Sequence, residues 1–522
     1  MPKFKPYDYN QSVMVAINYQ DQLQPGTLEH AINHLINDKI DLTVFYPKFN
    51  NDETGRPAYD PAILLKIILF AYSKGITSSR EIEWCCQHNI IFKSLSCGSV
   101  PHFTTIADFV SGRPEEIESI FEQILLICDQ RGLLGHELFA IDGCKMSSNA
   151  AKEWSGTHKE LRQKRDKIKK QIRYQLDQHK RLDKNESRDS ERRHKHQQAI
   201  DTLNQSFERI DQFLKTEPPR MGKGKIVKEV KSNITDNESA KMSTSRGTIQ
   251  GYNGLAAVDK KHQIIIDAQA FGEGQEHHTL QPILESVEER YRRLKICKDL
   301  FESGIMVTAD SGFANEDNMR YLHENQINAY VPDSQFRSRD PKFKEQKSKY
   351  GKRHQNDKKK TPKQLSANAF DFNPDNRTCR CPAGEPMWLK TDKIDKLGHH
   401  KLHFEGPVSK CRHCHLKPQC MRNPASPNGK NGHGRQVSFI IEKGKRKISY
   451  TDWMKKRVDS PEGKRIYGHR MSVVEPVFGN IGTNKRLNRF SLKGKRKVQG
   501  QWQLYCLVHN IKKIANYAQI AA

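Results

Sequence analysis

Two short apolar runs, each ended by an aspartate, constrain the fold of this chain more than any other feature. The first is Leu138–Ile141, followed by Asp142 and a glycine, and the second is Gly304–Ala309, followed by Asp310. Apolar runs of about four to eight residues between turn-forming residues are typical of buried strands. Helical patterns lie between and after them, which favours a mixed or parallel sheet covered by helices. The sequence therefore predicts an α/β domain with acidic side chains at the ends of two strands.

Further elements continue this alternation. Gly251–Leu280 has the pattern of a β-hairpin. The other expected elements are a helix over Gln281–Cys297, a helix over Asn315–Glu324, a strand over Asn328–Val331 and a helical block over Arg465–Ala522.

Residues 1–130 have an all-helical pattern. Asp60 and Pro61 open an amphipathic helix, and Ser78 and Thr104 mark the starts of two more. This module is either a DNA-binding and dimerisation domain or a plain helical cap on the sheet domain.

Residues 152–219 form a charged insertion. The apolar residues of its second arm follow 3-4-3-4 spacing, from Ile200 through Leu203, Phe207 and Ile210 to Leu214, which predicts a helical hairpin or coiled coil. The dense basic face of its first arm is either a solvated helix surface or a phosphate-contacting arm.

The charge balance indicates a polyanionic partner. Lys and Arg number 88 against 61 Asp and Glu, so the net charge is +27. The best apolar run, Ala62–Tyr72, is interrupted by Lys66 and is shorter than the ~20 residues of a membrane span. Met1–Asn10 lacks the apolar stretch of a signal peptide. We therefore expect a cytoplasmic protein, near the nucleoid if the host is bacterial.

The cysteines divide into two groups. Seven of the 12 are scattered among apolar segments and are interpreted as reduced core thiols. The others lie in a basic, Cys-rich insertion, residues 336–435, and are Cys379, Cys381, Cys411, Cys414 and Cys420. Their spacing predicts either a Zn²⁺ site that ties down this insertion or free surface thiols.

A third carboxylate, Glu475, stands among apolar residues in the late helical block. Two strand-end aspartates and one glutamate form the ligand set expected for two Mg²⁺ ions, because hard cations take carboxylate oxygens and keep positions open for water and phosphate. Taken alone, Asp142 is better explained as a turn former, as most strand-terminal aspartates are, so a catalytic role requires partners.

The motifs around these residues resemble the DDE transposases of bacterial insertion sequences, with an InsH-type helical N-terminal domain. The N-terminal resemblance rests on the stretch from Gly55-Arg56-Pro57 to Pro61, on Gly75–Glu81 and on Pro101–Ile106. In the rest of the chain the similar segments are FAIDGCKMSSNA, GYNGLAAVD, VTADSGFANEDNM and VVEPVFGNI. They occur in the family's order over nearly the whole chain.

The resemblance implies an RNase H-like domain over residues 131–335 and 436–522. It assigns Asp142 to the first strand, Asp310 to the fourth and Glu475 to the helix after the sheet, all three binding Mg²⁺ or Mn²⁺. In the Tyr-Arg-Glu-Lys variety of the family, the Tyr, Arg and Lys contact the transposon-end phosphates. Matching or neighbouring positions here are Tyr467, Arg470, Lys485, Arg486 and Arg489, while Gly482 occupies the position of the motif's Lys.

The implied reaction is hydrolysis at the transposon ends followed by attack of the freed 3′-hydroxyl on target DNA. The implied partners are double-stranded DNA and a second copy of the chain that holds the other end. The alternatives are a nuclease without strand transfer and a catalytically inactive DNA-binding regulator.

Overall fold

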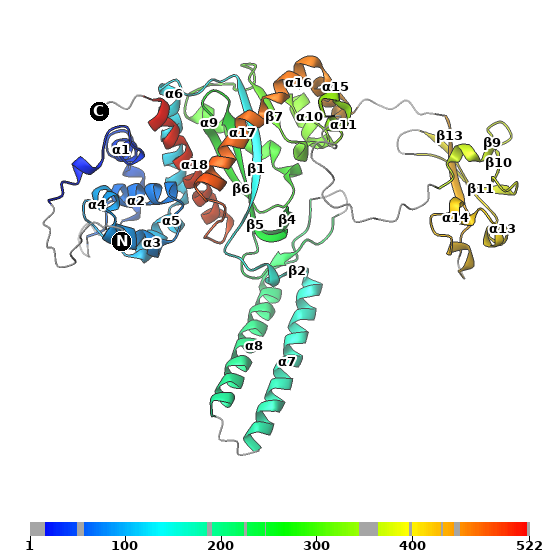
Figure 1. The fold of residues 1–522 in the computed structure, drawn as a ribbon, viewed down its shortest axis with the longest axis horizontal. Helices are drawn as coiled ribbons and strands as arrows, with labels where there is room; N and C mark the ends of the chain where they lie inside the picture. The colour runs from blue at the N-terminus through cyan, green and yellow to red at the C-terminus, as the bar shows by residue number, and fades with distance from the viewer. Residues whose placement is uncertain are drawn as a thin grey trace, which may run out of the picture. The chain divides into compact units, whose positions relative to one another are not determined.

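The structure is a computed structural model that describes residues 16–49, 57–184, 190–223, 227–245, 247–343, 364–395, 399–429, 432–442 and 449–518. The expectations for Met1–Asn10, for Gly55 and Arg56, and for most of the basic segment 336–365 lie outside the described residues. The chain divides into two compact units (Figure 1). The first combines Met1–Ser334 with Met454–Ala522, and the second is Gln335–Trp453.

The N-terminal region is helical, as predicted. Asp60 caps its second helix by accepting a hydrogen bond from the Ala62 N–H at 2.7 Å, and Pro61 stands at the first helical position. The third expected helix begins at Phe103, where the His102 ring caps the Thr104 N–H. The helices are α1 (Leu28–His34), α2 (Pro61–Ser73), α3 (Ser79–His88), α4 (Ile90–Leu95), α5 (Phe103–Gly112) and α6 (Pro114–Gln130).

A mixed sheet forms the centre of the first unit. Its strand order is β4-β5-β1-β7-β8, and β6 also pairs with β5. β1 is antiparallel to β5 and parallel to β7, and β7 is parallel to β8. The strands are β1 (Leu138–Ser147), β4 (Ala240–Thr244), β5 (Gly247–Asp259), β6 (Ile265–Phe271), β7 (Met306–Ala309) and β8 (Ala329–Tyr330). The predicted mixed α/β architecture, with a helical region before it, is therefore confirmed.

Helices α9 (Leu280–Arg293), α10 (Glu316–Glu324), α15 (Tyr450–Asp459), α16 (Pro461–Gly468), α17 (Arg470–Gly479) and α18 (Lys495–Tyr517) complete the unit. The last of them joins the sheet to the N-terminal helices, because it packs on β6 and on α1, α2, α5 and α6. Its amide side chains also occupy the outer edge of β6. Gln499 and Asn510 each exchange hydrogen bonds of 2.7–2.9 Å with backbone groups of that strand. An edge strand is thereby covered inside one chain.

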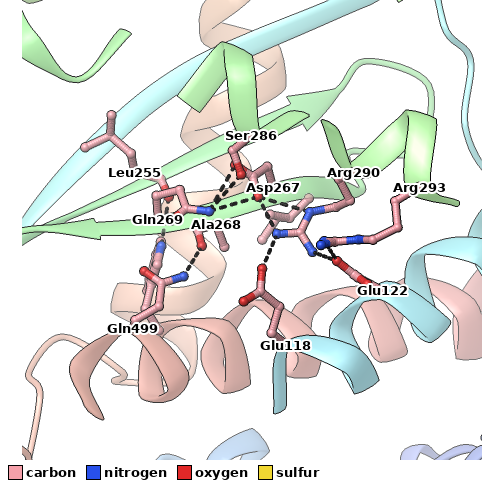
Figure 2. Close-up of polar contacts among 12 residues, drawn as sticks. Glu118, Glu122, Leu255, Asp267, Ala268, Gln269, Ser286, Arg290, Arg293 and Gln499 are labelled. Atoms are coloured by element: carbon pink, nitrogen blue, oxygen red, sulfur yellow. Dashed lines mark hydrogen bonds and ion pairs between the residues drawn. The ribbon is translucent and has the colours of Figure 1, made fainter. Parts of the chain in front are cut away.

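A buried ion cluster fixes α6 against the sheet (Figure 2). Arg290 of α9 is only 1% exposed, and its guanidinium contacts Asp267 of β6 at 2.8 Å. The same guanidinium reaches two carboxylates of α6, Glu122 at 2.8 Å and Glu118 at 3.1 Å. Arg293 also pairs with Glu122. One fully buried cation therefore links three elements.

The charged insertion forms a hairpin of two antiparallel helices, α7 (His158–Lys184) and α8 (Ser190–Thr216), which run side by side (Figure 1). Its buried seam consists of Leu161, Ile168, Ile210 and Phe213. A two-residue bridge, β2 (Ser155–Gly156) with β3 (Ser232–Asn233), closes its base. The period of apolar residues thus predicted the pairing of the two arms.

The second unit has its own antiparallel sheet in the order β13-β12-β11-β10-β9. It contains β9 (Asp371–Asn373), β10 (Thr378–Arg380), β11 (Pro386–Ile394), β12 (His400–Glu405), β13 (Gln436–Glu442) and the short helices α11 (Phe336–Arg339), α13 (Val408–His413) and α14 (Lys417–Cys420). This unit continues past residue 435, where the sequence placed its end, because β13 pairs with β12. In the parts of the chain described here, no helix has the length and apolar content to cross a bilayer.

Candidate active site

Parallel pairing of β1 with β7 brings the two predicted aspartates to the same part of the sheet. Ile141 of β1 lies opposite Ala309 of β7 in the register, and Asp142 and Asp310 are the next residues along each strand. Asp310 caps the following turn by accepting the Ser311 N–H at 2.6 Å. β1 itself continues past Asp142 to pair with β5. Residues 168 positions apart in the sequence therefore become neighbours through strand register alone.

The environment of Asp142 is electrostatically unfavourable for its own charge. Its side chain is 20% exposed, and burial raises its pKa to about 6, against the lowering effects of Arg470 and of the Gly143 N–H. The carboxylates of Asp310 and Glu276 raise this pKa further. Clustered carboxylates in a partly buried site favour binding of a cation, which would replace the missing positive charge.

Arg470 supplies part of that positive charge. It is the first residue of α17, is 5% exposed, and its Nη2 lies 2.8 Å from Asp142 Oδ2. α17 packs against β1 and β5, which holds the start of this helix at the strand-end aspartates. In this structure the guanidinium is therefore directed at a carboxylate of the site and not at solvent.

Glu276 is a member of this group that the sequence reasoning missed. It lies in the turn that follows β6, and its Oε1 accepts a hydrogen bond from Asn253 Nδ2 at 3.2 Å. A Cβ at position 312 would collide with its carboxylate, so Gly312, two residues after Asp310, allows the close approach. The available signal was strand direction: β6 runs the same way as β1 and β7, so the segment after it reaches the same edge of the sheet.

Glu475 lies on α17, five positions after Arg470. It is exposed, whereas Val473, Val474 and Val477 of the same helix are buried. Within the described ranges, no three His, Cys, Asp or Glu side chains are arranged closely enough to hold a metal ion. The structure thus groups Asp142, Asp310 and Glu276, and places Glu475 on the helix whose first residue contacts Asp142.

The residues predicted to contact DNA are divided between the surface and the interior. Tyr467 is half-buried in α16, and Arg486 and Arg489 are exposed. Lys485 is 4% exposed, its Nζ donates to Asn480 Oδ1 at 3.0 Å, and burial beside Lys512 and Lys513 lowers its pKa to about 8.

Arg489 lines a cavity of about 470 Å³ in the first unit. Arg80 of α3 and Asn149, just after β1, line the same cavity. It therefore adjoins both the N-terminal helices and the chain that follows the first aspartate strand. Two arginines from separate elements make it a candidate site for phosphate contacts.

The five cysteines of the second unit do not share one environment. Cys379 is 2% exposed, and its Sγ lies 3.8 Å from Met387 Sδ in the small core. The other four, Cys381, Cys411, Cys414 and Cys420, line a common pocket. All are free thiols.

Acidic residues gathered where parallel strands end can hold metal ions that act on phosphates, and a net charge of +27 suits a nucleic-acid partner. Residues 17–112 match a family model described as "Transposase domain (DUF772)", and residues 380–515 match one described as "Transposase DDE domain". The two matches indicate a DDE-type insertion-sequence transposase. They confirm the resemblance inferred from the motifs. No curated protein and no solved structure matches the chain.

Proposed function

We propose that this transposase cuts the ends of its insertion sequence and joins the freed 3′-hydroxyl to target DNA at the Asp142–Asp310 site. The observation that supports this most is the β1–β7 register, which brings two carboxylates together although nothing local in the sequence links them. The strand order supports an RNase H-like assignment for this domain, with Asp310 after the fourth of the strands β1, β5, β6, β7 and β8.

The residues present suit Mg²⁺ or Mn²⁺, since they offer carboxylate oxygens in a partly buried region, where burial and then neighbouring carboxylates raise the pKa of Asp142. Asp142, Asp310 and Glu475 would hold the ions. The ions would neutralise charge on the reacting phosphate and make its attacking and leaving oxygens more reactive.

The protein's own residues position the reactants. Arg470 holds the Asp142 carboxylate in place at 2.8 Å. Arg489 and Arg80 would contact phosphates in the shared cavity, which adjoins the chain after the Asp142 strand through Asn149. In the first step a water oxygen attacks phosphorus and the DNA 3′-oxygen leaves. In the second step that 3′-hydroxyl oxygen attacks a target phosphate and displaces a target 3′-oxygen.

We assign the DNA-binding and dimerisation role to residues 1–130, and a DNA-contacting role to the exposed basic face of α7. The catalytic role falls to residues 131–335 together with the helices that follow the second unit. A homodimer would hold the two ends. The charge of +27 supports this division of roles, because two DNA segments must be held against their mutual repulsion.

The test uses the inverted repeats that flank the gene as substrate, with a pre-cut end and a target plasmid in a parallel assay. Asp142→Ala, Asp310→Asn and Glu475→Gln should each abolish cleavage and joining while DNA binding and folding persist. Asp317→Asn is the matched control, because Asp317 is 75% exposed on α10 and pairs with neighbouring Arg320. Normal cleavage by any of the first three variants contradicts the proposal. Cleavage without a joined product indicates a nuclease, and full biological activity of Asp142→Ala indicates a regulator.

A further inference from the structure

The second unit has few means of stabilising itself. Its buried cluster consists of Phe370, Cys379, Met387, Leu402, Phe404, Cys420, Met421 and Val437. Several large apolar side chains of its sheet remain exposed, among them Trp388, Ile394 and Ile440. Small units with a core of this size commonly depend on a metal ion or a disulfide. The twelve cysteines of the chain include no disulfide.

Four thiols from separate segments surround one small pocket in this unit. Cys381 lies in the turn between β10 and β11, Cys411 is in α13, Cys414 ends α13 and Cys420 ends α14. The pocket volume is about 40 Å³, which is room for an ion or a water molecule but not for an organic ligand. Such a group is typical of a closed structural Zn²⁺ site.

The backbone around two of these thiols is already fixed. The Cys381 N–H donates to the Glu385 carbonyl at 2.9 Å and the Gly384 N–H donates to the Cys381 carbonyl at 2.8 Å, with Gly384 at φ +81°. This tight turn presents Cys381 at the rim of the pocket.

Cys411 is supported differently. Its Sγ accepts the Arg435 N–H at 3.5 Å. Gly406 and Gly434 approach that sulfur so closely that added Cβ atoms would lie 3.1 and 3.4 Å from it. A backbone N–H directed at sulfur is the kind of second interaction that stabilises a metal-bound thiolate.

The charge around the pocket suits bound thiolates. Four thiolates and one Zn²⁺ carry a net charge of −2, and Lys410, Lys417 and Arg435 line the same pocket.

We propose that Cys381, Cys411, Cys414 and Cys420 bind one structural Zn²⁺ and that Cys379 does not. Cys379 is excluded because strand register pairs it with Phe372 and Met387 inside the core. In the second unit as described, no three of these sulfurs stand at metal-binding distance of a common point. Binding must therefore bring the four sulfurs closer together, which couples the metal to the order of this unit.

The test measures metal content of the full chain, purified with reductant and without chelator after growth with zinc. We expect about one Zn²⁺ per chain, as in other four-thiolate sites. Cys411→Ser and Cys414→Ser should each lower zinc occupancy by about tenfold or more. Cys379→Ser, a buried thiol in the same unit, and Cys97→Ser, an exposed thiol in the first unit, should keep full occupancy.

A second measurement covers the case in which a variant does not fold. Wild-type protein loaded with Co²⁺ should show thiolate-to-cobalt charge transfer and the absorption of a tetrahedral ion, and zinc should displace it. Absence of these bands, zinc-free wild-type protein after zinc supply, or equal zinc retention in Cys411→Ser and wild type would overturn the proposal. The proposal would also be overturned if Cys379→Ser lost its zinc while Cys411→Ser kept the zinc content of the wild type. No DNA is used, so the result is independent of the proposed transposition chemistry.

Discussion

Removing the Arg290 guanidinium should destabilise the first unit more than almost any other single change. Arg290→Met keeps much of the side-chain volume but leaves three carboxylates without their shared cation. Asp267 is fully buried and Glu122 is 14% exposed, whereas Glu118 is 39% exposed and can be solvated. Breaking a buried ion pair by removing one partner costs about 3–5 kcal/mol, since the remaining charge stays desolvated.

Arg293→Met is the matched control. Arg293 pairs with the same Glu122, but its side chain is 51% exposed, and exposed pairs contribute about 0–1 kcal/mol. Adding Asp267→Leu to Arg290→Met should recover part of the lost stability, because apolar replacement of a buried pair is often neutral.

The effect should also depend on pH. Burial already raises the pKa of Glu122, against the opposing effect of Arg290 and Arg293. Without Arg290 that pKa rises further above its unfolded value, so ionisation of the folded state then costs stability. The deficit of Arg290→Met should therefore be largest at neutral and higher pH and should shrink as pH falls.

Urea unfolding measures the free energy of unfolding, and hydrogen exchange of the β6 amides reports the stability of the first unit separately from that of the second. The reasoning is refuted if Arg290→Met unfolds within about 1 kcal/mol of wild type, or no more easily than Arg293→Met.

Three further predictions concern the candidate active site. Mg²⁺ affinity should fall about tenfold for each pH unit below pH 6, because the pKa of Asp142 is raised to about 6 and its proton must leave before the ion binds. Calorimetric titration with Mg²⁺ at several pH values would show this fall, and an affinity that does not change with pH would contradict it. Glu276→Gln removes one of the like charges that raise the pKa of Asp142, so that pKa should move down in a carboxyl NMR titration, and an unchanged value would mean that the two groups do not interact. Arg489→Ala should weaken binding to all DNA sequences and reduce the slope of log K against log salt concentration by about 1. Binding measurements at several salt concentrations test this, and an unaltered slope would mean that Arg489 does not contact phosphate.

Much of the fold could be predicted because local signals and tertiary structure agree. The β5–β6 hairpin, the Asp60 cap of α2 and the paired arms of the α7–α8 hairpin all follow from residue periodicity and capping. The two aspartates were also identifiable, because each follows an apolar run. Neither apolar run predicts that the two aspartates lie close together, because their proximity depends on the parallel pairing of β1 with β7.

The missed features depend on contacts between distant segments. Glu276 lies five residues beyond the end of β6 and not directly at a strand end, so it gains its place through the direction of β6 and the turn that follows it. Arg470 matches the family's Arg that contacts transposon-end phosphates, and its contact with Asp142 depends on tertiary packing that the sequence alone does not show. In the Cys-rich unit, spacing found the five thiols, but only strand register separates Cys379 from the other four.

The position of α18 in the chain has a consequence for synthesis. Until the ribosome has translated the residues after Lys495, α18 does not exist. The edge of β6 then lacks its hydrogen-bond partner, and α1, α2, α5 and α6 lack the helix on which they pack. Chains stopped before that point would expose apolar helix faces and an unpaired strand, which invites aggregation and proteolysis. A prematurely ended product of this gene should therefore be cleared by the cell before it can compete with intact copies for DNA.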